Sequence, residues 1–351
     1  MATAERRRFY ELAVARVDRL CEDAVAITFD VPVELAEMFR FRPGQSLTLR
    51  RHERRRSYSV CSPPGHPLRI GVREVTGGAV SGWLVRDARA GDRIEVQPPA
   101  GSFTPDVATA ARHVLIAAGS GITPTLSIAA SVLANPRSQV TLLYGNRRSD
   151  SVMFADELAD LKDAHAARLQ LLHVLSREAQ EVELFTGRMD AVKLRRLLPV
   201  VCDPLEVGHW WLCGPFGMVA GAMSVLSELG VPGERVHREL FYVEDTAPEP
   251  ARHDEPAPSG GCEVTVVLDG RSTAVTVPRG TPVLDGAQRA RPDLPFACKG
   301  GVCGTCRARL VAGEVRMRRN FALEPAELEA GFVLTCQSLP VSDALTVDFD
   351  T

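Results

Sequence analysis

Four cysteines near the C-terminal end constrain the fold of this chain more than any other feature. Cys298, Cys303 and Cys306 lie close together in the segment CKGGVCGTC, and Cys336 follows after a long gap. This is the spacing with which plant-type [2Fe-2S] clusters are ligated. Two iron ions need four thiolates that converge on one small volume, so a tight loop supplies three and a distant strand end supplies the fourth. We therefore predict that the chain binds a [2Fe-2S] cluster and transfers electrons singly.

The glycines between these cysteines support this prediction. Gly300, Gly301 and Gly304 allow backbone angles that are closed to other residues, so the loop can wrap tightly and bring N–H groups near the cluster sulfurs. A zinc site is the alternative. A zinc ribbon would require two CxxC pairs, whereas this chain has one CxxxxCxxC and a single remote cysteine.

The composition is that of a globular protein with several domains. At 351 residues and 45% hydrophobic content, the chain is long enough for two or three domains, each with its own core. The net charge of −3 gives no general bias toward nucleic acid or anionic membranes. The N-terminal segment lacks the apolar run of a signal peptide, and no stretch reaches the length of a membrane span. We expect a cytoplasmic protein with neither nucleic-acid nor membrane partners.

Residues 246–261 mark a boundary within the chain. They read TAPEPARHDEPAPSGG, with proline, charge and almost no large apolar side chain, which is typical of a linker. We predict a multidomain architecture in which an α+β, β-grasp-like ferredoxin domain over residues 262–351 follows this linker. Before it we predict an antiparallel β-barrel domain over residues 1–107 and an α/β parallel-sheet nucleotide domain over residues 108–245.

The nucleotide domain is predicted from alternating apolar β runs and amphipathic helical stretches. The expected strands are HVLIAA, QVTLLYG, LQLLHVLS, HWWLCGP and RVHRELF, and the expected helices cover residues 125–133, 152–165, 189–198 and 217–229. The first strand runs into the turn GSGITP, where Thr123 and Pro124 suit a helix N-cap and first helical position. Such a turn can place helix N–H groups against a pyrophosphate, although many ordinary strand-to-helix turns also use glycines.

The barrel domain contains two candidate flavin-binding segments. In Arg56-Ser57-Tyr58-Ser59, the arginine can hold a phosphate, the tyrosine can lie against a flavin ring and Ser59 can lie near its reactive nitrogen. In GGAVSGWL, Gly78 and Ser81 can present polar groups to a phosphate at a helix start. Taken singly, each segment also fits an ordinary structural role, the first as an exposed strand and the second as a glycine turn that caps a helix.

The order of these motifs resembles a known superfamily. RxYS, GxxS, GSGITP, CGPFGM and ELF follow one another as in the ferredoxin-NADP reductase superfamily, and the C-terminal module is similar to that of the reductase components of multicomponent oxygenases. Among these, the chain resembles the reductase subunits of phenylacetyl-CoA epoxidases over essentially its whole length. The segments that carry the resemblance are FRPGQSLTL, RRSYSVCS, AAGSGITP, LLYGNRRSDSVMF, CKGGVCGTC and NFALEPAELEAGFVLTCQSLP.

The resemblance implies binding and catalytic roles for individual positions. It implies that FAD contacts a set of barrel residues: Arg56, Ser57, Tyr58, Ser59, Val72, Glu74, Gly78 and Ser81. It implies a pyridine-nucleotide loop and a segment beside the nicotinamide, made by Gly119, Gly121, Thr123, Pro124, Cys213, Gly214 and Pro215. Glu239 and Phe241 match a motif that borders the flavin ring. The catalytic candidates are Ser59, Cys213 and Glu239, although Cys213 also fits a buried apolar position and Glu239 a solvated one.

The choice between NADPH and NADH depends on arginines, because the 2′-phosphate of NADPH adds negative charge that they recognise. The candidates are Arg147, which follows the second expected strand, and Ser176, Arg177 and Arg188, which are similar to positions that hold this phosphate in NADP-specific relatives. They can also be ordinary surface charges, and Glu178 beside Arg177 keeps that alternative open. We expect NADPH, with NADH less suited.

The expected activity follows from a two-electron donor and a one-electron cluster on one chain. NADPH reduces the flavin by hydride transfer, and the electrons pass singly to the cluster and then to an oxygenase. The resemblance implies a di-iron oxygenase that epoxidises phenylacetyl-CoA in phenylacetate catabolism. Two alternatives remain: a reductase for a Rieske-type oxygenase such as the steroid 9α-hydroxylase system, and a non-catalytic redox sensor or carrier.

A basic stretch around the cluster loop is a candidate docking face for an acidic oxygenase surface, or else a solvated basic hairpin. Its members are Lys299, Arg307, Arg309, Arg316, Arg318 and Arg319, against the single acid Glu314.

Overall fold

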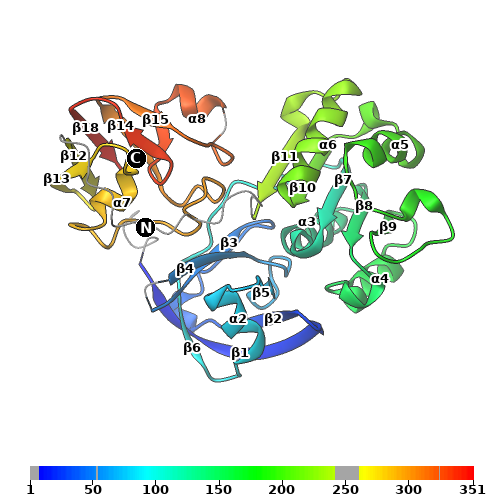
Figure 1. The fold of residues 1–351 in the computed structure, drawn as a ribbon. Coiled ribbons are helices and arrows are strands. Elements are labelled where there is room, and N and C mark those ends of the chain that lie inside the picture. The colour runs from blue at the N-terminus through cyan, green and yellow to red at the C-terminus, as the bar shows by residue number, and fades with distance from the viewer. Residues whose placement is uncertain (1–7, 53, 242–260, 324) are drawn as a thin grey trace. The chain divides into compact units, whose positions relative to one another are not determined.

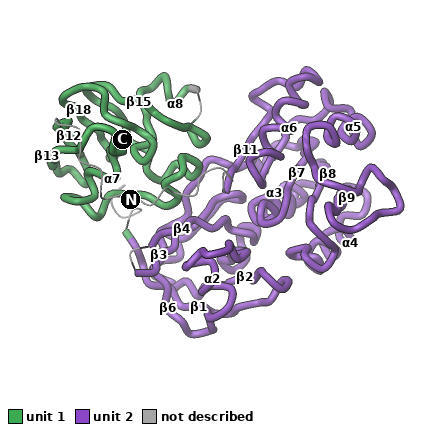
Figure 2. Tube along the Cα trace, in the orientation of Figure 1, with its two compact units in different colours: residues 1–8, 242–351 green, residues 9–241 purple. Residues whose placement is uncertain are grey.

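The structure is a computed structural model that describes residues 8–52, 54–241, 261–323 and 325–351 (Figure 1). The chain forms two compact units: residues 9–241, and residues 242–351 together with 1–8 (Figure 2). The predicted linker, 246–261, lies outside the described residues except for Gly261, which begins the first strand of the C-terminal unit. None of the helices in the described part of the chain has the length and apolar character needed to cross a bilayer.

The first part of the larger unit is a six-stranded antiparallel sheet with the order β4-β3-β6-β1-β2-β5. A bridge between Val60 and Ile70 joins its two edges, so the sheet closes into the predicted barrel. Helix α2 (Ala79–Arg86) packs against β2, β4 and β5. The strands are β1 (Tyr10–Cys21), β2 (Ala24–Asp30), β3 (Ser46–Arg51), β4 (Arg54–Ser59), β5 (Arg69–Arg73) and β6 (Arg93–Val96).

The second part is a five-stranded parallel sheet with the order β11-β10-β7-β8-β9. Its central strands are largely apolar and buried because helices cover parallel sheets on both faces. The chain order reverses between β7 and β10, and ligands of such sheets bind outside the carboxyl ends of the strands at this point. The strands are β7 (Arg112–Ala118), β8 (Gln139–Asn146), β9 (Leu169–Leu175), β10 (His209–Gly214) and β11 (Val236–Leu240), and the helices are α3 (Ile122–Leu133), α4 (Ala155–Ala164), α5 (Ala191–Val201) and α6 (Phe216–Glu228).

Helix α3 begins earlier than the sequence predicts. A short 3-10 turn over Gly119–Gly121 leads directly into the helix, so Gly121 and not Thr123 is the N-cap residue. The Thr123 hydroxyl instead donates back to the carbonyl of Ser120 at 3.0 Å. Pro124 lies inside the first turn, where a missing N–H breaks no bond within the helix. The predicted cap was therefore wrong by two residues.

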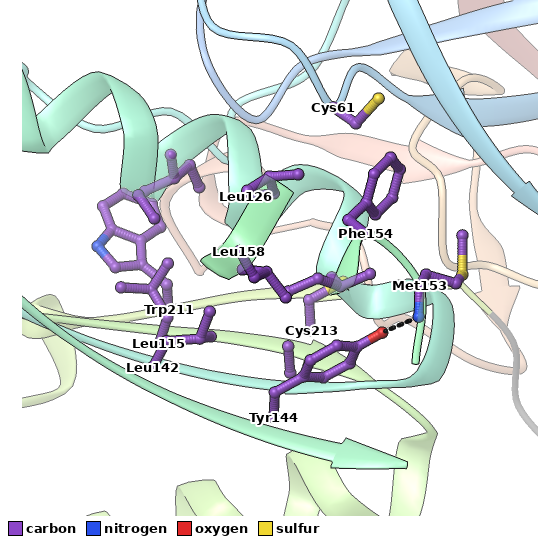
Figure 3. Close-up of a cluster of buried hydrophobic side chains, with 14 of the residues drawn as sticks. Cys61, Leu115, Leu126, Leu142, Tyr144, Met153, Phe154, Leu158, Trp211 and Cys213 are labelled. Atoms are coloured by element: carbon purple, nitrogen blue, oxygen red, sulfur yellow. Dashed lines mark hydrogen bonds between the residues drawn. The ribbon is translucent and has the colours of Figure 1, made fainter. Parts of the chain in front are cut away.

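One apolar core joins the barrel to the parallel sheet (Figure 3). Cys61 of the barrel and Phe154 of the nucleotide domain belong to the same buried cluster as Leu115 and Trp211. The Tyr144 hydroxyl, also in this cluster, accepts from a backbone N–H at 3.3 Å and donates to a loop carbonyl at 3.1 Å. A shared core makes the relative placement of the two domains part of the fold.

The C-terminal unit has the predicted α+β architecture. A five-stranded mixed sheet with the order β13-β12-β18-β14-β16 packs against α7, and a two-stranded ribbon pairs β15 with β17. Its elements are β12 (Gly261–Leu268), β13 (Arg271–Pro278), α7 (Val283–Ala287), β14 (Arg307–Ala312), β15 (Val315–Met317), α8 (Pro325–Glu329), β16 (Phe332–Leu334), β17 (Ser338–Pro340) and β18 (Ala344–Asp348).

Three histidines gather on neighbouring strands of the parallel sheet. His113 is 1% exposed, and its Nδ1 accepts a hydrogen bond from Trp211 Nε1 at 3.3 Å, so the ring is neutral with its proton on Nε2. His237 stacks on Trp211 with ring centroids 4.1 Å apart, and its Nε2 lies 3.1 Å from Nδ1 of His209. Burial, followed by the charges of the other two histidines, lowers the pKa of His113 to about 4.

This arrangement predicts a loss of stability in acid. An imidazole whose pKa falls from 6.5 to about 4 on folding binds its proton more tightly in the unfolded chain, so the free energy of unfolding is unaffected above pH 6.5 and decreases as the pH drops toward 4. The full effect of His113 is about 3 kcal/mol. His113→Asn keeps an acceptor for Trp211 but does not titrate, so it should flatten the pH dependence of urea unfolding followed by tryptophan fluorescence.

The exposed His66 supplies the control, because His66→Asn should leave the wild-type pH dependence intact. Equal acid sensitivity in His113→Asn and wild type would contradict the assignment.

Candidate functional site

The four predicted cluster ligands lie together in the C-terminal unit and form two pairs. The thiols of Cys298 and Cys303 interact by a hydrogen bond, and those of Cys306 and Cys336 do the same. Charge interactions link the two pairs, because Cys303 contributes to raising the pKa of Cys306 and Cys298 opposes the lowering of the pKa of Cys336. A two-iron cluster needs two thiolates for each iron, which is what this donor set offers.

The surroundings favour the thiolate form at two ligands. The thiol of Cys303, and then the backbone N–H groups of Val302, Gly300 and Cys303, lower the pKa of the Cys298 thiol to about 5. The Cys306 thiol and the side chain of Gln337 lower the pKa of Cys336. The same thiol pairings, and then burial, raise the pKa values of Cys303 and Cys306 well above the usual range, so the structure favours one thiolate in each pair.

The ligand loop needs unusual backbone angles and close packing. Lys299 has a φ of 52°, and Gly301 has a φ of 80°. A Cβ at Gly301 would lie 3.0 Å from the side chain of Gln337 and 3.3 Å from the carbonyl of Arg319. Within the described ranges, no three His, Cys, Asp or Glu side chains are grouped closely enough to hold a single metal ion.

The three residues predicted as catalytic come together where the barrel meets the parallel sheet. Ser59 ends β4 and donates its hydroxyl to Glu239 Oε2 at 3.1 Å, and Glu239 lies beside Cys213 in the register of β11 and β10. The Glu239 side chain keeps a partial opening to solvent, but the protein packed around it raises its pKa to about 8. Cys213 is fully buried, and burial raises the pKa of its thiol well above the usual value. Phe241 packs against the same core.

The RSYS segment is a strand, as predicted. Arg56 and Tyr58 lie opposite Leu49 and Leu47 of β3, so they share one face, and Ser57 meets Thr48 on the other face at 3.2 Å. Burial raises the pKa of the Tyr58 phenol, and the nearby Arg56 guanidinium offsets part of this rise. A cation close to a half-buried aromatic ring suits a ligand that carries both a phosphate and an aromatic ring system.

The other residues predicted to contact the flavin in the barrel domain make contacts within the barrel itself. The Val72 side chain is fully buried in the barrel core, and Glu74 pairs with Arg86. Gly78 caps α2, while the buried Ser81 hydroxyl accepts from Val75 N at 3.1 Å and donates to the Gly78 carbonyl at 3.3 Å. The Ser81 hydroxyl thus closes the turn, which is the ordinary structural role left open above.

A basic cavity beside the start of α2 was not predicted. It is lined by Arg51, His52 and Arg54 of the β3–β4 hairpin and by Ala79 and Val80 of the helix. Three basic side chains and a helix N-terminus favour an anion at this place. The run RRHERR immediately before RSYS was the signal that could have indicated it.

The predicted nucleotide loop lies at the carboxyl edge of the parallel sheet. Gly121 packs so closely on β10 that a Cβ there would collide with the carbonyl of Cys213. Thr123 and Pro124 are buried in the first turn of α3, and Gly119 precedes them with a φ of 55°. The loop is therefore tied to the segment Cys213, Gly214 and Pro215, which ends β10 and precedes α6.

The arginines predicted to read a 2′-phosphate follow β8 and β9 at the same edge. A bridge between Leu175 and Thr186 brings the segment of Arg188 beside that of Ser176 and Arg177. In the described part of the chain, no ion pair engages the side chain of Arg177 or Arg188.

Two acidic side chains near these arginines, Asp23 and Glu178, each have a partner. Arg147 pairs with Asp23 of the barrel at 2.8 Å, and Asp23 also lies 3.1 Å from Arg73. Glu178 accepts from Ser149 N at 2.9 Å and from Ser149 Oγ at 3.0 Å. Arg147 is therefore neutralised across the domain boundary, and the carboxylate of Glu178 is held by Ser149.

The basic stretch near the cluster is less charged than the sequence suggests. Lys299 pairs with Asp285 at 2.8 Å, and Arg307 pairs with Glu327. Arg309, Arg316 and Arg318 remain exposed.

Two family models match the chain. The Oxidoreductase NAD-binding domain matches residues 115–224, and the 2Fe-2S iron-sulfur cluster binding domain matches residues 266–341.

Relatives match over nearly the whole length. The chain is 42% identical over 352 residues to the E component of the 1,2-phenylacetyl-CoA epoxidase of Escherichia coli (strain K12), covering 97% of this chain and 98% of that protein. It is 37% identical over 355 residues to the ferredoxin reductase component of the 3-ketosteroid-9-alpha-monooxygenase of Mycobacterium tuberculosis (strain ATCC 25618 / H37Rv), covering 97% and 96%. Phthalate dioxygenase reductase, a solved structure described as modular and transferring electrons from pyridine nucleotides to [2Fe-2S], has the same fold, with a TM-score of 0.62 at 24% identity over 97% and 98% of the two chains.

The paired thiols generate a spectroscopic prediction. Cys336→Ser should remove the visible absorption of the cluster and the EPR signal of its reduced state, because one iron loses a thiolate, while the flavin absorption remains. Ferricyanide reduction by NADPH should persist, and cytochrome reduction should fall.

Cys262→Ser is the matched control, since Cys262 is a fully buried cysteine of the same unit outside the ligand set. An intact EPR signal in Cys336→Ser would remove Cys336 from the ligands.

Proposed function

The chain belongs to the ferredoxin-NADP reductase-like reductase components of oxygenases that carry a C-terminal [2Fe-2S] module, and on that premise we propose that it transfers electrons from NADPH through FAD and the cluster to the di-iron oxygenase of a phenylacetyl-CoA epoxidase. The proposal rests chiefly on the meeting of Ser59 from the barrel with Cys213 and Glu239 from the parallel sheet. A flavin between the two domains would there face the nucleotide loop, which is the arrangement that hydride transfer requires.

The residues around this point suit FAD. Arg56 and Tyr58 would hold the phosphate and the ring system, and the basic cavity at Arg51, His52 and Arg54 offers a place for the second phosphate and nucleoside that distinguish FAD from FMN. Bound flavin supplies a two-electron acceptor that can release electrons one at a time.

The chain's own groups position the reactants and manage one proton. Gly121 packs against the backbone of Cys213, so the nucleotide loop and the end of β10 form one rigid edge for the nicotinamide. With a pKa of about 8, the Glu239 carboxyl is mostly protonated at pH 7 and can hold a proton beside the Ser59 hydroxyl. The buried Cys213 thiol stays neutral and packs as a small apolar group.

The cluster ligands would be Cys298, Cys303, Cys306 and Cys336. Their pairing would suit two irons, and the N–H groups of the loop would stabilise the charge that reduction adds.

The absence of an acid on the predicted 2′-phosphate residues favours NADPH over NADH. Glu178 is next to Arg177 in the sequence and could have neutralised it. Its carboxylate instead accepts hydrogen bonds from Ser149, so the Arg177 guanidinium is available to bind a phosphate. Arg147 must give up Asp23 before it can do the same, so its net contribution should be smaller.

The oxygenase partner is inferred from the relatives. The epoxidase component of Escherichia coli shares more identical residues with this chain than the steroid monooxygenase reductase does, which favours a phenylacetyl-CoA epoxidase. None of the nine cysteines forms a disulfide, which suits the reducing cytoplasm where we place the protein.

The nucleotide assignment predicts a selective defect. Arg177→Ala or Arg188→Ala should weaken NADPH binding by about 1.5 to 3 kcal/mol, the size of a lost hydrogen bond to a charged group, with little effect on NADH. Arg147→Ala should cost less because Asp23 already neutralises Arg147. Equilibrium titration with both nucleotides measures the effect, and equal losses for NADPH and NADH would show that these arginines do not read the 2′-phosphate.

The partner assignment predicts selective coupling. With the purified oxygenase components of a phenylacetyl-CoA epoxidase, NADPH oxidation should yield epoxide from phenylacetyl-CoA, and replacing them by a Rieske-type steroid oxygenase should uncouple the reaction. Efficient turnover only with the Rieske-type oxygenase would overturn the choice of partner while leaving the reductase activity in place.

A further inference from the structure

Gln337 follows the fourth predicted ligand directly, and its side chain is buried at 4% exposure. Its Nε2 donates to the carbonyl of Lys299 at 2.8 Å and to the carbonyl of Cys336 at 3.1 Å, and it lies 3.6 Å from Cys336 Sγ. A single amide therefore contacts both chain segments that supply ligands, the loop and the distant strand.

The contact with Lys299 holds the loop at a strained position. Lys299 lies next to the ligand Cys298 and has a φ of 52°, an angle that non-glycine residues rarely adopt. The bond from Gln337 to its carbonyl helps to maintain that conformation. The Gln337 side chain also packs on Gly301, where a Cβ would come within 3.0 Å of it.

The backbone around Gln337 fixes the direction of its side chain. Its N–H donates to the carbonyl of Leu334 at 2.8 Å, and its carbonyl accepts from Arg318 N at 2.9 Å. The amide consequently has little freedom to turn away from the ligand loop.

Nε2 carries two N–H groups, so the one on the side of Cys336 is shared between that residue's carbonyl and its Sγ. Its position beside the sulfur has an electrostatic consequence. Reduction adds one negative charge to a cluster and its thiolates, and a nearby N–H dipole stabilises the reduced state more than the oxidised state. A donor at this place should therefore raise the reduction potential.

We propose that Gln337 is a positioning residue of the cluster site, whose amide joins the ligand loop to the ligand strand and raises the reduction potential through its N–H toward Cys336 Sγ. The proposal rests on the cluster ligation described under the proposed function.

Thr335 provides a matched control on the other side of Cys336. Its buried hydroxyl donates to the carbonyl of Cys306 at 2.9 Å. Like Gln337, it makes a buried hydrogen bond to the backbone of the ligand region, but its hydroxyl bonds a carbonyl and not a sulfur. Thr335→Val therefore reports the loss of a buried bond without the loss of an N–H to sulfur.

The test compares Gln337→Leu with Thr335→Val in the full-length protein by EPR-monitored redox titration and by iron and sulfide analysis. Gln337→Leu should lower the equilibrium constant for one-electron reduction of the cluster by about tenfold, which is about 59 mV for a one-electron couple. It should also shift the EPR g-values. Thr335→Val should lower thermal stability and leave the potential near that of wild type.

An unchanged potential in a Gln337→Leu protein that holds its cluster would overturn the proposal, as would an equal shift in Thr335→Val. If the wild type itself contained no iron and sulfide, the ligand assignment would fail instead.

A Gln337→Leu protein that loses its cluster while Thr335→Val keeps it would support the positioning role. The N–H contact would then be tested in wild type labelled with ¹⁵N in its glutamine side chains. Pulsed EPR of the reduced cluster should show a ¹⁵N coupling that persists in Gln288→Ala, which removes the other glutamine bonded to Lys299. Absence of that coupling would overturn the N–H contact.

Discussion

The meeting of Ser59 with Glu239 is the interaction on which the proposed function of the larger unit depends. One residue comes from the barrel and the other from the parallel sheet, and their side chains lie 3.1 Å apart although 180 positions separate them in the chain. Hydride transfer requires two ligands held face to face to within a fraction of an ångström, so neither domain alone can build this site. The shared core around Phe154 and Trp211 holds the two domains in place for it.

Ion pairs across the same boundary strengthen this arrangement. Arg69 of the barrel pairs with Glu157 at 3.0 Å, and Asp23 lies between Arg73 and Arg147. These arginines serve the joining of the domains, which removes them from the charge available to a ligand. The arginines that follow β9 have no such partner in the described part of the chain, so they are the ones suited to a phosphate.

The cluster site in the C-terminal unit must offset repulsion between like charges. Thiolates of like charge must converge, and the repulsion is offset by N–H groups from a loop held in unusual backbone angles. Gly301 permits the approach of Gln337, and Gln337 in turn holds the carbonyl of Lys299. Two of the basic residues near the loop are neutralised by acids from α7 and α8, so the charge on this surface comes mainly from arginines such as Arg316 and Arg318.

The sequence by itself determined the fold class and the kinds of chemistry. Short β runs between proline and glycine turns predicted the barrel, and apolar β runs alternating with amphipathic helical stretches predicted the parallel sheet. The cysteine spacing predicted the cluster. These patterns express local backbone geometry and donor type. The cap of α3 was misplaced because the close approach of Gly121 to Cys213, and not the capping propensity of Thr123, decides where the helix begins. Only the tertiary structure decided that Arg147 pairs with Asp23, that His113 accepts from Trp211 and that Gln337 bridges the ligand segments. These pairings join side chains far apart in the chain. Tertiary packing selects the partners, and the local sequence around each residue does not specify that packing.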